Sequence, residues 1–117
     1  MQIVVHGIPN CDTVKKARAW LDAHGVPYRF HDFRKDGVPS AQGAQWARDP
    51  GWEALLNRRG TTWRKLDAPT QAGAVDAASA MALMQAHPSV IRRPVVDWGD
   101  AVTVGFDPAA WAVRTGR

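Results

Sequence analysis

The spacing of apolar residues changes several times along the chain, and each change marks a predicted element. Ile3-Val4-Val5 is a short apolar run closed by Gly7 and Pro9, which is typical of a buried strand followed by a loop. From Asp12 to His24, apolar residues recur three and four positions apart, and this spacing predicts an amphipathic helix. The segment from Val26 to Phe33 alternates imperfectly, as a second strand does. Together these segments predict a βαβ unit.

The middle of the chain is predicted to be wholly helical. Ser40 is placed to cap a helix that continues to about Arg48, and the spacing of apolar residues over 52–56 predicts a short helix. Thr70 is expected to cap an alanine-rich helix that ends at His87, because the proline that follows cannot continue it.

Near the end of the chain the sequence again has the pattern of β-strands. Residues 94–96 and 102–104 flank a turn and predict a β-hairpin, and Asp107 is placed to cap a last helix from Pro108 to Val113. The predicted order is therefore β-α-β, then helices, then β-β-α, which is an α/β architecture. Since no repeat or long linker interrupts the pattern, we expect one domain over residues 1–117.

The composition of the chain limits the cellular compartments in which it is expected and the classes of partner that it is expected to bind. The chain has 117 residues, a formal net charge of +4 and a single cysteine, so an intrachain disulfide is excluded and a reducing compartment is favoured. The sequence has neither a signal-peptide pattern nor an apolar stretch long enough to span a membrane, and we expect a cytoplasmic protein. The basic residues lie in separate short clusters, which permits an anionic partner but disfavours nucleic acid.

The single cysteine is the strongest candidate for chemistry. Cys11 stands between the first predicted strand and its helix, where unpaired N–H groups and the helix dipole stabilise a thiolate. A lone cysteine is more often an inert apolar residue, but polar neighbours on both sides argue against that interpretation here. Because no second cysteine can resolve a disulfide, turnover requires an external thiol such as glutathione or another protein.

A second candidate site lies before the predicted hairpin. Arg93 precedes Pro94 and is able to hold a carboxylate or an oxyanion through two hydrogen bonds, although a solvated arginine pair is an equal alternative. The four histidines and Cys11 show no metal-ligand spacing, and we predict no metal.

Several segments, taken together, resemble the ArsC/Spx family and within it the YffB-type branch. The resemblance covers nearly the whole chain and rests on Gly7–Ala17, Phe33–Gly37, Gly51–Asn57, Arg59–Arg64 and His87–Pro94. It implies a thioredoxin-like fold, βαβ…ββα, with a helical insertion at about 39–88. It also implies that Cys11 is the reactive residue.

The resemblance carries over to activity only position by position. Cys11 matches the nucleophile of the family's arsenate reductases, and Arg93 matches one of the arginines that hold arsenate. Asn57 stands where those enzymes have a second arginine, although Arg58 follows it, and the acidic Asp107 stands where they have a third. An acid repels arsenate, so these departures disfavour arsenate reduction. Val14 replaces the second cysteine of the Spx redox switch.

We therefore predict a monomeric, glutathione-dependent thiol oxidoreductase with no tightly bound cofactor. Cys11 attacks a disulfide, Asn10, Thr13, Arg93 and Pro94 shape the site, and Arg58 binds a carboxylate of glutathione. The alternatives are an arsenate reductase-like enzyme and a non-catalytic, Spx-like module that binds a protein partner. A nucleic-acid partner or a membrane partner is not expected.

Overall fold

A computed structural model describes residues 2–117, and the chain divides into two compact units. The sheet unit comprises Met1–Asp32 and Arg93–Arg117, and the helical unit comprises Phe33–Arg92. The predicted insertion at about 39–88 lies within the helical unit. That the two units make one domain stays a prediction.

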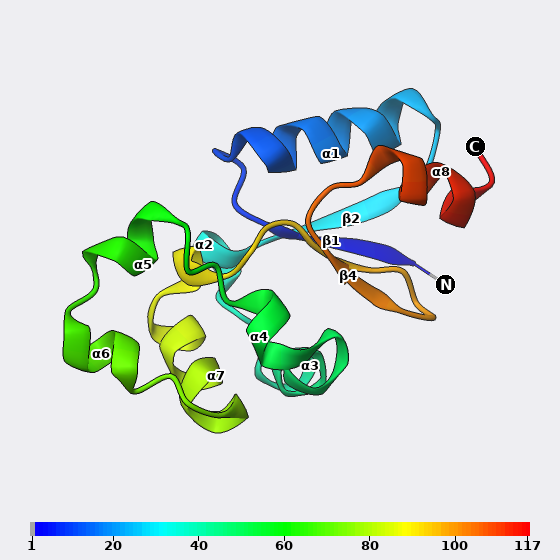
Figure 1. Ribbon diagram of the computed structural model, residues 1–117. Helices are drawn as coiled ribbons and strands as arrows, with labels where there is room; N and C mark the ends of the chain where they lie inside the picture. Colours follow the sequence, from blue (N-terminus) through cyan, green and yellow to red (C-terminus); the bar gives the residue numbers. More distant parts are fainter. Residues whose placement is uncertain (1) are drawn as a thin grey trace. The chain divides into compact units, whose positions relative to one another are not determined.

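The sheet unit has the predicted β-α-β and β-β-α order (Figure 1). Strand β1 (Ile3–Gly7) pairs in parallel with β2 (Tyr28–Asp32) and antiparallel with β3 (Val95–Asp97). Strand β4 (Val102–Val104) pairs antiparallel with β3, so the order across the sheet is β2-β1-β3-β4. The pairing of β1 with β3 brings the two halves of this unit together from opposite ends of the chain.

Helix α1 (Asp12–Ala23) connects β1 to β2. Its predicted apolar face is confirmed, because Val14, Ala17 and Leu21 are all fully buried. Ala17 and Leu21 pack in one core cluster with sheet residues that include Val5. Burial of this face against the sheet, rather than intrinsic propensity, fixes the helix in place.

Helix α8 (Pro108–Thr115) covers the same face of the sheet as α1 (Figure 1). Its cap is the predicted one, since the Asp107 carboxylate accepts a hydrogen bond from the N–H of Ala110 at 3.1 Å. Trp111 anchors the helix through edge-on ring contacts, with centroids 5.9 Å from Trp20 and 5.1 Å from Trp98.

The helical unit consists of helices, as the sequence predicts, and most of them are short. They are α2 (Phe33–Asp36), α3 (Ser40–Trp46), η1 (Ala47–Gly51), α4 (Trp52–Leu55), α5 (Thr61–Lys65), α6 (Ala68–Ala72), α7 (Ala77–Ala86) and η2 (Pro88–Val90). Phe33, Trp46, Leu55 and Met84 are buried in it, and a single β-bridge joins Leu56 to Ile91.

Two predicted helix starts are wrong. Ser40 does not cap α3, because Pro39 occupies the cap position. Thr70 does not begin a long helix either. The Asp67 carboxylate accepts from the N–H of Thr70 at 2.8 Å and caps the short α6, which ends at Ala72. A separate helix, α7, begins after Asp76, which forms a reciprocal capping box with Ser79.

Two further boundaries also differ from the prediction. Strand β2 is shorter than the expected segment, since Phe33 already belongs to α2. Helix α5 was not predicted as a separate element, because its five residues are too few to produce a periodic apolar pattern.

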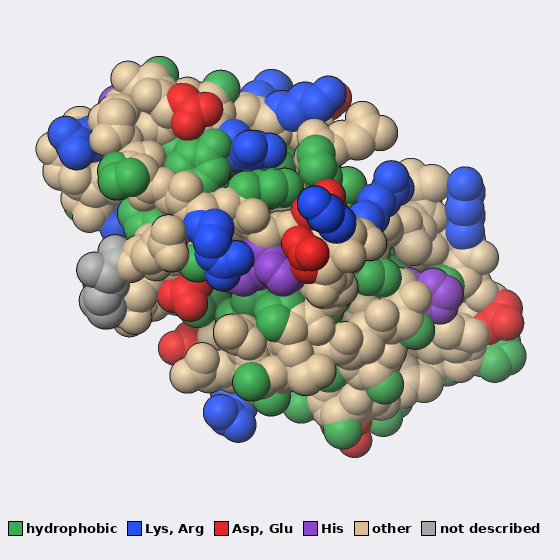
Figure 2. Space-filling model, turned by 180° about the vertical axis from the view of Figure 1, so that it is seen from behind, with side chains coloured by type: hydrophobic (Ala, Val, Ile, Leu, Met, Phe, Trp, Pro, Cys, Tyr) green, Lys and Arg blue, Asp and Glu red, His purple; other side chains and the backbone are tan. Residues whose placement is uncertain are grey.

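The basic side chains lie in separate groups on the surface, as the separate basic clusters of the sequence predict. On the face shown in Figure 2, Lys and Arg side chains form several groups with acidic side chains between them. No helix in residues 2–117 is both long enough and apolar enough to cross a membrane.

The packing of α8 lets us predict how substitutions in this helix change the free energy of unfolding. Trp111 is 3% exposed, whereas Val113 on the same helix is 86% exposed. Trp111→Ala should lower the free energy of unfolding by about 3–5 kcal/mol, because it leaves a cavity among the rings of Trp20, Trp98 and Phe106. Val113→Ala should change it by less than about 0.5 kcal/mol. Urea denaturation followed by circular dichroism measures both, and equal losses would contradict the packing described.

Candidate functional site

Cys11 lies in the loop that joins β1 to α1 and occupies the N-cap position of that helix. Its backbone is extended, with φ −121° and ψ 127°, and its carbonyl oxygen accepts the first helical hydrogen bond from the Lys15 N–H at 2.9 Å. The side chain is half-buried. The predicted position of the thiol at the start of the helix is therefore confirmed.

The close approach of the strand and the helix requires the glycine before this loop. A Cβ atom at Gly7 would lie 2.9 Å from a methyl carbon of Val14, which is a contact that real Cβ atoms essentially never make. Gly7 thus lets the end of β1 pack directly on the first turn of α1. This packing fixes the loop that carries Cys11.

Two opposing effects act on the pKa of the Cys11 thiol. Burial raises it, while hydrogen bonds from the Val14 N–H, the Arg93 side chain and the Thr13 N–H lower it, together with the positive charge of Arg93. The lowering effects prevail, so the pKa is below its ordinary value. The site favours the thiolate, which is the nucleophilic form.

Arg93 reaches this thiol because of the sheet topology. It directly precedes Pro94 and β3, and β3 pairs with β1, the strand that leads to Cys11. The Arg93–Pro94 peptide bond is cis, and the carbonyl of the buried Pro94 accepts a hydrogen bond from the Gly105 N–H at 2.9 Å. The structure thus brings together Cys11, Thr13 and Arg93, and Pro94 follows Arg93 directly in the chain.

The other predicted site residues have different surroundings. Asn10 is exposed in the turn before Cys11. Arg58 belongs to the helical unit, where its guanidinium carbon lies 5.9 Å from the ring centroid of Trp52 and 5.8 Å from that of Trp63. Contact with two aromatic rings orients an arginine without neutralising it. The role of Arg58 in binding glutathione stays a prediction.

One residue that supports the site was not predicted from the sequence. His6 in β1 is buried, and its Nδ1 lies 3.1 Å from the Val95 carbonyl oxygen in β3. This contact joins the strand that leads to Cys11 to the strand that follows Arg93. Burial is the main cause that lowers the pKa of His6 to about 4, so the ring is neutral at pH 7 and donates to the carbonyl from Nδ1.

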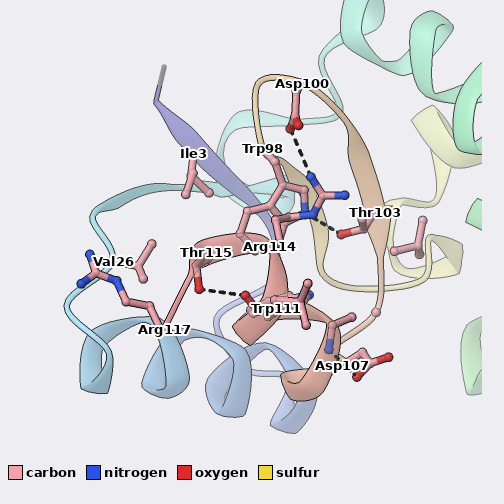
Figure 3. A pocket seen from close by; sticks show the side chains of 14 residues that line it. Ile3, Val26, Trp98, Asp100, Thr103, Asp107, Trp111, Arg114, Thr115 and Arg117 are labelled. Carbon is pink, nitrogen blue, oxygen red and sulfur yellow. Dashed lines mark hydrogen bonds and ion pairs between the residues drawn. The ribbon is translucent and has the colours of Figure 1, made fainter.

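A pocket of the sheet unit lies away from this chemistry. It has a volume of about 740 Å³ and lies between α8 and the β3–β4 hairpin (Figure 3). Arg114 forms an ion pair with Asp100 at 3.1 Å and lies against Trp98 in this pocket. Neither Cys11 nor Arg93 lines it, so its size does not make it the reactive site.

Metal ligands do not gather around the thiol in the part of the chain that the structure describes. Residues 2–117 contain no group of three or more His, Cys, Asp or Glu side chains placed to hold an ion.

Comparison with known proteins places these features in a family. The model of the ArsC family matches residues 6–113. The solved structure of a YffB protein superposes with a TM-score of 0.90 at 47% identity, covering 96% of this chain and 97% of that one. An arsenate reductase (ArsC)-related protein from Brucella melitensis gives a TM-score of 0.75 at 44% identity, covering 100% and 97%.

A more distant likeness is found among transcriptional regulators. The global transcriptional regulator Spx of Listeria innocua is 23% identical over 107 residues, which are 90% of this chain and 80% of that one. The two solved structures, of the YffB protein and the Brucella protein, confirm the predicted α/β, thioredoxin-like fold.

The Arg93–Cys11 contact predicts a measurable change in acidity. Arg93→Ala removes one hydrogen bond and one positive charge from the thiolate and leaves the effect of burial, so the pKa of Cys11 should rise. Thiolate absorbance measured against pH, with Cys11→Ser as baseline, gives the two values. Arg92→Ala, which removes the neighbouring exposed arginine, should leave the pKa nearly unchanged, and an equal rise in both variants would rule out a specific contact.

The buried His6 predicts a pH dependence of stability. Its pKa is about 4 in the folded protein against 6.5 when unfolded, so the unfolded chain binds more protons between these values. The free energy of unfolding should therefore fall by roughly 3 kcal/mol as the pH drops from about 7 to about 4. His6→Gln should abolish this slope and the exposed control His87→Gln should keep it. A slope that survives His6→Gln would assign it to other groups.

Proposed function

The chain belongs to the ArsC family, in its YffB-type branch, and we propose that it acts there as a glutathione-dependent thiol oxidoreductase with Cys11 as nucleophile. The observation that carries the proposal is the hydrogen bond of Arg93 to the Cys11 thiol, reinforced by the N–H groups of Val14 and Thr13. The fold is that of the family's thiol oxidoreductases. The dependence on glutathione and the direction of the reaction are what we propose.

The reaction consists of two thiol–disulfide exchanges. In the first, the Cys11 thiolate attacks the glutathione sulfur of a mixed disulfide between glutathione and a protein. The S–S bond breaks, the protein leaves as a thiolate, and Cys11 keeps the glutathionyl group. In the second, a glutathione thiolate attacks this new disulfide, which releases oxidised glutathione and restores the Cys11 thiolate. One disulfide is consumed and one is formed, so the electrons balance.

The single cysteine determines how the cycle is completed. A dithiol enzyme resolves its mixed disulfide internally, but this sequence offers no second cysteine. The second thiol must come from solution, and glutathione is the abundant thiol of a reducing compartment. Glutathione is thus a co-substrate that leaves after each turnover. In this scheme Arg93 lowers the energy of the attacking thiolate, and Arg58 binds a carboxylate of the tripeptide.

Arsenate reduction is an alternative to the proposed reaction, because the Brucella relative is described as related to an arsenate reductase. Binding a multiply charged oxyanion requires several cations around the thiol. In this chain Asp107 stands where a third arginine is expected, and its carboxylate accepts from the Ala110 N–H to cap α8. Its negative charge disfavours an arsenate ion. The other alternative is a docking role like that of Spx, which does not depend on thiol chemistry.

Mass spectrometry after exposure to oxidised glutathione tests the proposal. The wild-type protein should gain one glutathionyl group at Cys11, and reduced glutathione should remove it. Cys11→Ser should remain unmodified and lose all reductase activity toward a glutathionylated peptide. The charge-removing variant Arg58→Ala should still form the adduct and require more glutathione for turnover.

Three outcomes would contradict the proposal. Absence of the adduct under conditions that modify a free cysteine peptide excludes glutathione chemistry at Cys11. Loss of the adduct in the presence of an equal concentration of arsenate favours arsenate as the substrate. Binding of a protein partner that is unchanged in Cys11→Ser, with no reductase activity in the wild type, favours the docking role.

A further inference from the structure

Three sequence segments that the thiol chemistry does not use meet in one pocket of the helical unit. Arg34 comes from α2, Thr62 from α5, and His87, Pro88 and Ser89 from the end of α7 and from η2. Each belongs to a segment on which the family resemblance rests, and the segments are far apart in the sequence. The pocket has a volume of about 370 Å³, which is within the range of small-molecule sites.

The polar side chains of this pocket are all able to donate hydrogen bonds. Arg34 supplies a guanidinium group, Thr62 and Ser89 supply hydroxyl groups, and His87 supplies an imidazole. None of the lining residues is acidic. Such a lining attracts an anion and offers no carboxylate to hold a cation.

The apolar part of the lining gives the pocket a rigid floor. Phe33 is 1% exposed and packs edge-on against Trp46, with ring centroids 6.3 Å apart. Phe33 itself offers a ligand almost no surface, so the accessible apolar atoms of the lining come mainly from Ala86 and Pro88. A bound molecule therefore meets both hydrogen-bond donors and apolar atoms in this pocket, as in most small-molecule sites.

We propose that this pocket binds a small phosphate monoester, with the phosphoryl oxygens on Arg34, Thr62, His87 and Ser89 and an apolar body on Ala86 and Pro88. Four donor side chains suit the three oxygens of a phosphoryl group better than the two oxygens of a carboxylate. The planar guanidinium of Arg34 holds two of these oxygens at once. This inference concerns a second ligand and does not depend on the proposed thiol function.

Titration calorimetry with phenyl phosphate tests the proposal, using the full-length wild-type protein. Phenyl phosphate should bind more tightly than inorganic phosphate, which lacks the apolar body, and more tightly than phenylacetate, which has a carboxylate. Benzyl alcohol, which has no charge, should not bind measurably. Cys11→Ser should bind phenyl phosphate as the wild type does.

Matched variants of adjacent exposed cations locate the site. Arg34→Ala should weaken phenyl phosphate binding by about tenfold or more, because it removes a charged, two-pronged contact. Lys35→Ala, which removes a charge outside the lining, should weaken it by about twofold or less. The paired replacement of Thr62 by Val and Ser89 by Ala should also weaken it, while circular dichroism verifies that each variant is folded.

The results that would overturn the proposal are distinct. No binding of phenyl phosphate at millimolar concentration removes the site. Tighter binding of phenylacetate makes it a carboxylate site, and equal binding of benzyl alcohol makes it an apolar one. Equal effects of Arg34→Ala and Lys35→Ala would mean that phenyl phosphate is held by diffuse electrostatic attraction and not by this pocket.

Discussion

The hydrogen bond between the Arg93 side chain and the Cys11 sulfur connects the two halves of the sheet unit at the point where chemistry is possible. A thiol that is partly removed from water has a raised pKa, and this alone would make Cys11 inert. The guanidinium and the N–H groups of the first helical turn reverse that effect. The reactivity of the site therefore depends on holding Arg93 against a cysteine from the other end of the chain.

Much of the sheet unit serves to maintain that contact. The antiparallel pairing of β1 with β3 aligns the two strands, and the buried His6 fastens them through the Val95 carbonyl oxygen. Gly7 lets α1 begin close to the end of β1, so the N–H groups of its first turn reach the sulfur. A substitution in any of these residues is expected to act on the thiol through position, without touching it.

The sequence predicted the parts of the fold that depend on local pattern. The face of α1, the Asp107 cap and the order of the elements along the chain follow from apolar spacing and capping chemistry. The helix starts after Asp67 and Asp76 were missed, because several cap-forming residues lie close together there and packing decides which is used. Cys11 was predicted from its place before a helix, but its contact with Arg93 is long-range. Only the family resemblance pointed to that pair, and nothing in the sequence marks His6 as buried.

The most direct test of this account is the rate at which a neutral alkylating reagent modifies Cys11 in the wild-type protein as a function of pH. The rate follows the thiolate fraction, so its midpoint gives the pKa of the thiol in the native site. We predict a midpoint clearly below the ordinary thiol value of about 8.5. A midpoint at or above that value would mean that burial outweighs Arg93 and the helix N–H groups, and the account of Cys11 as an activated nucleophile would be wrong.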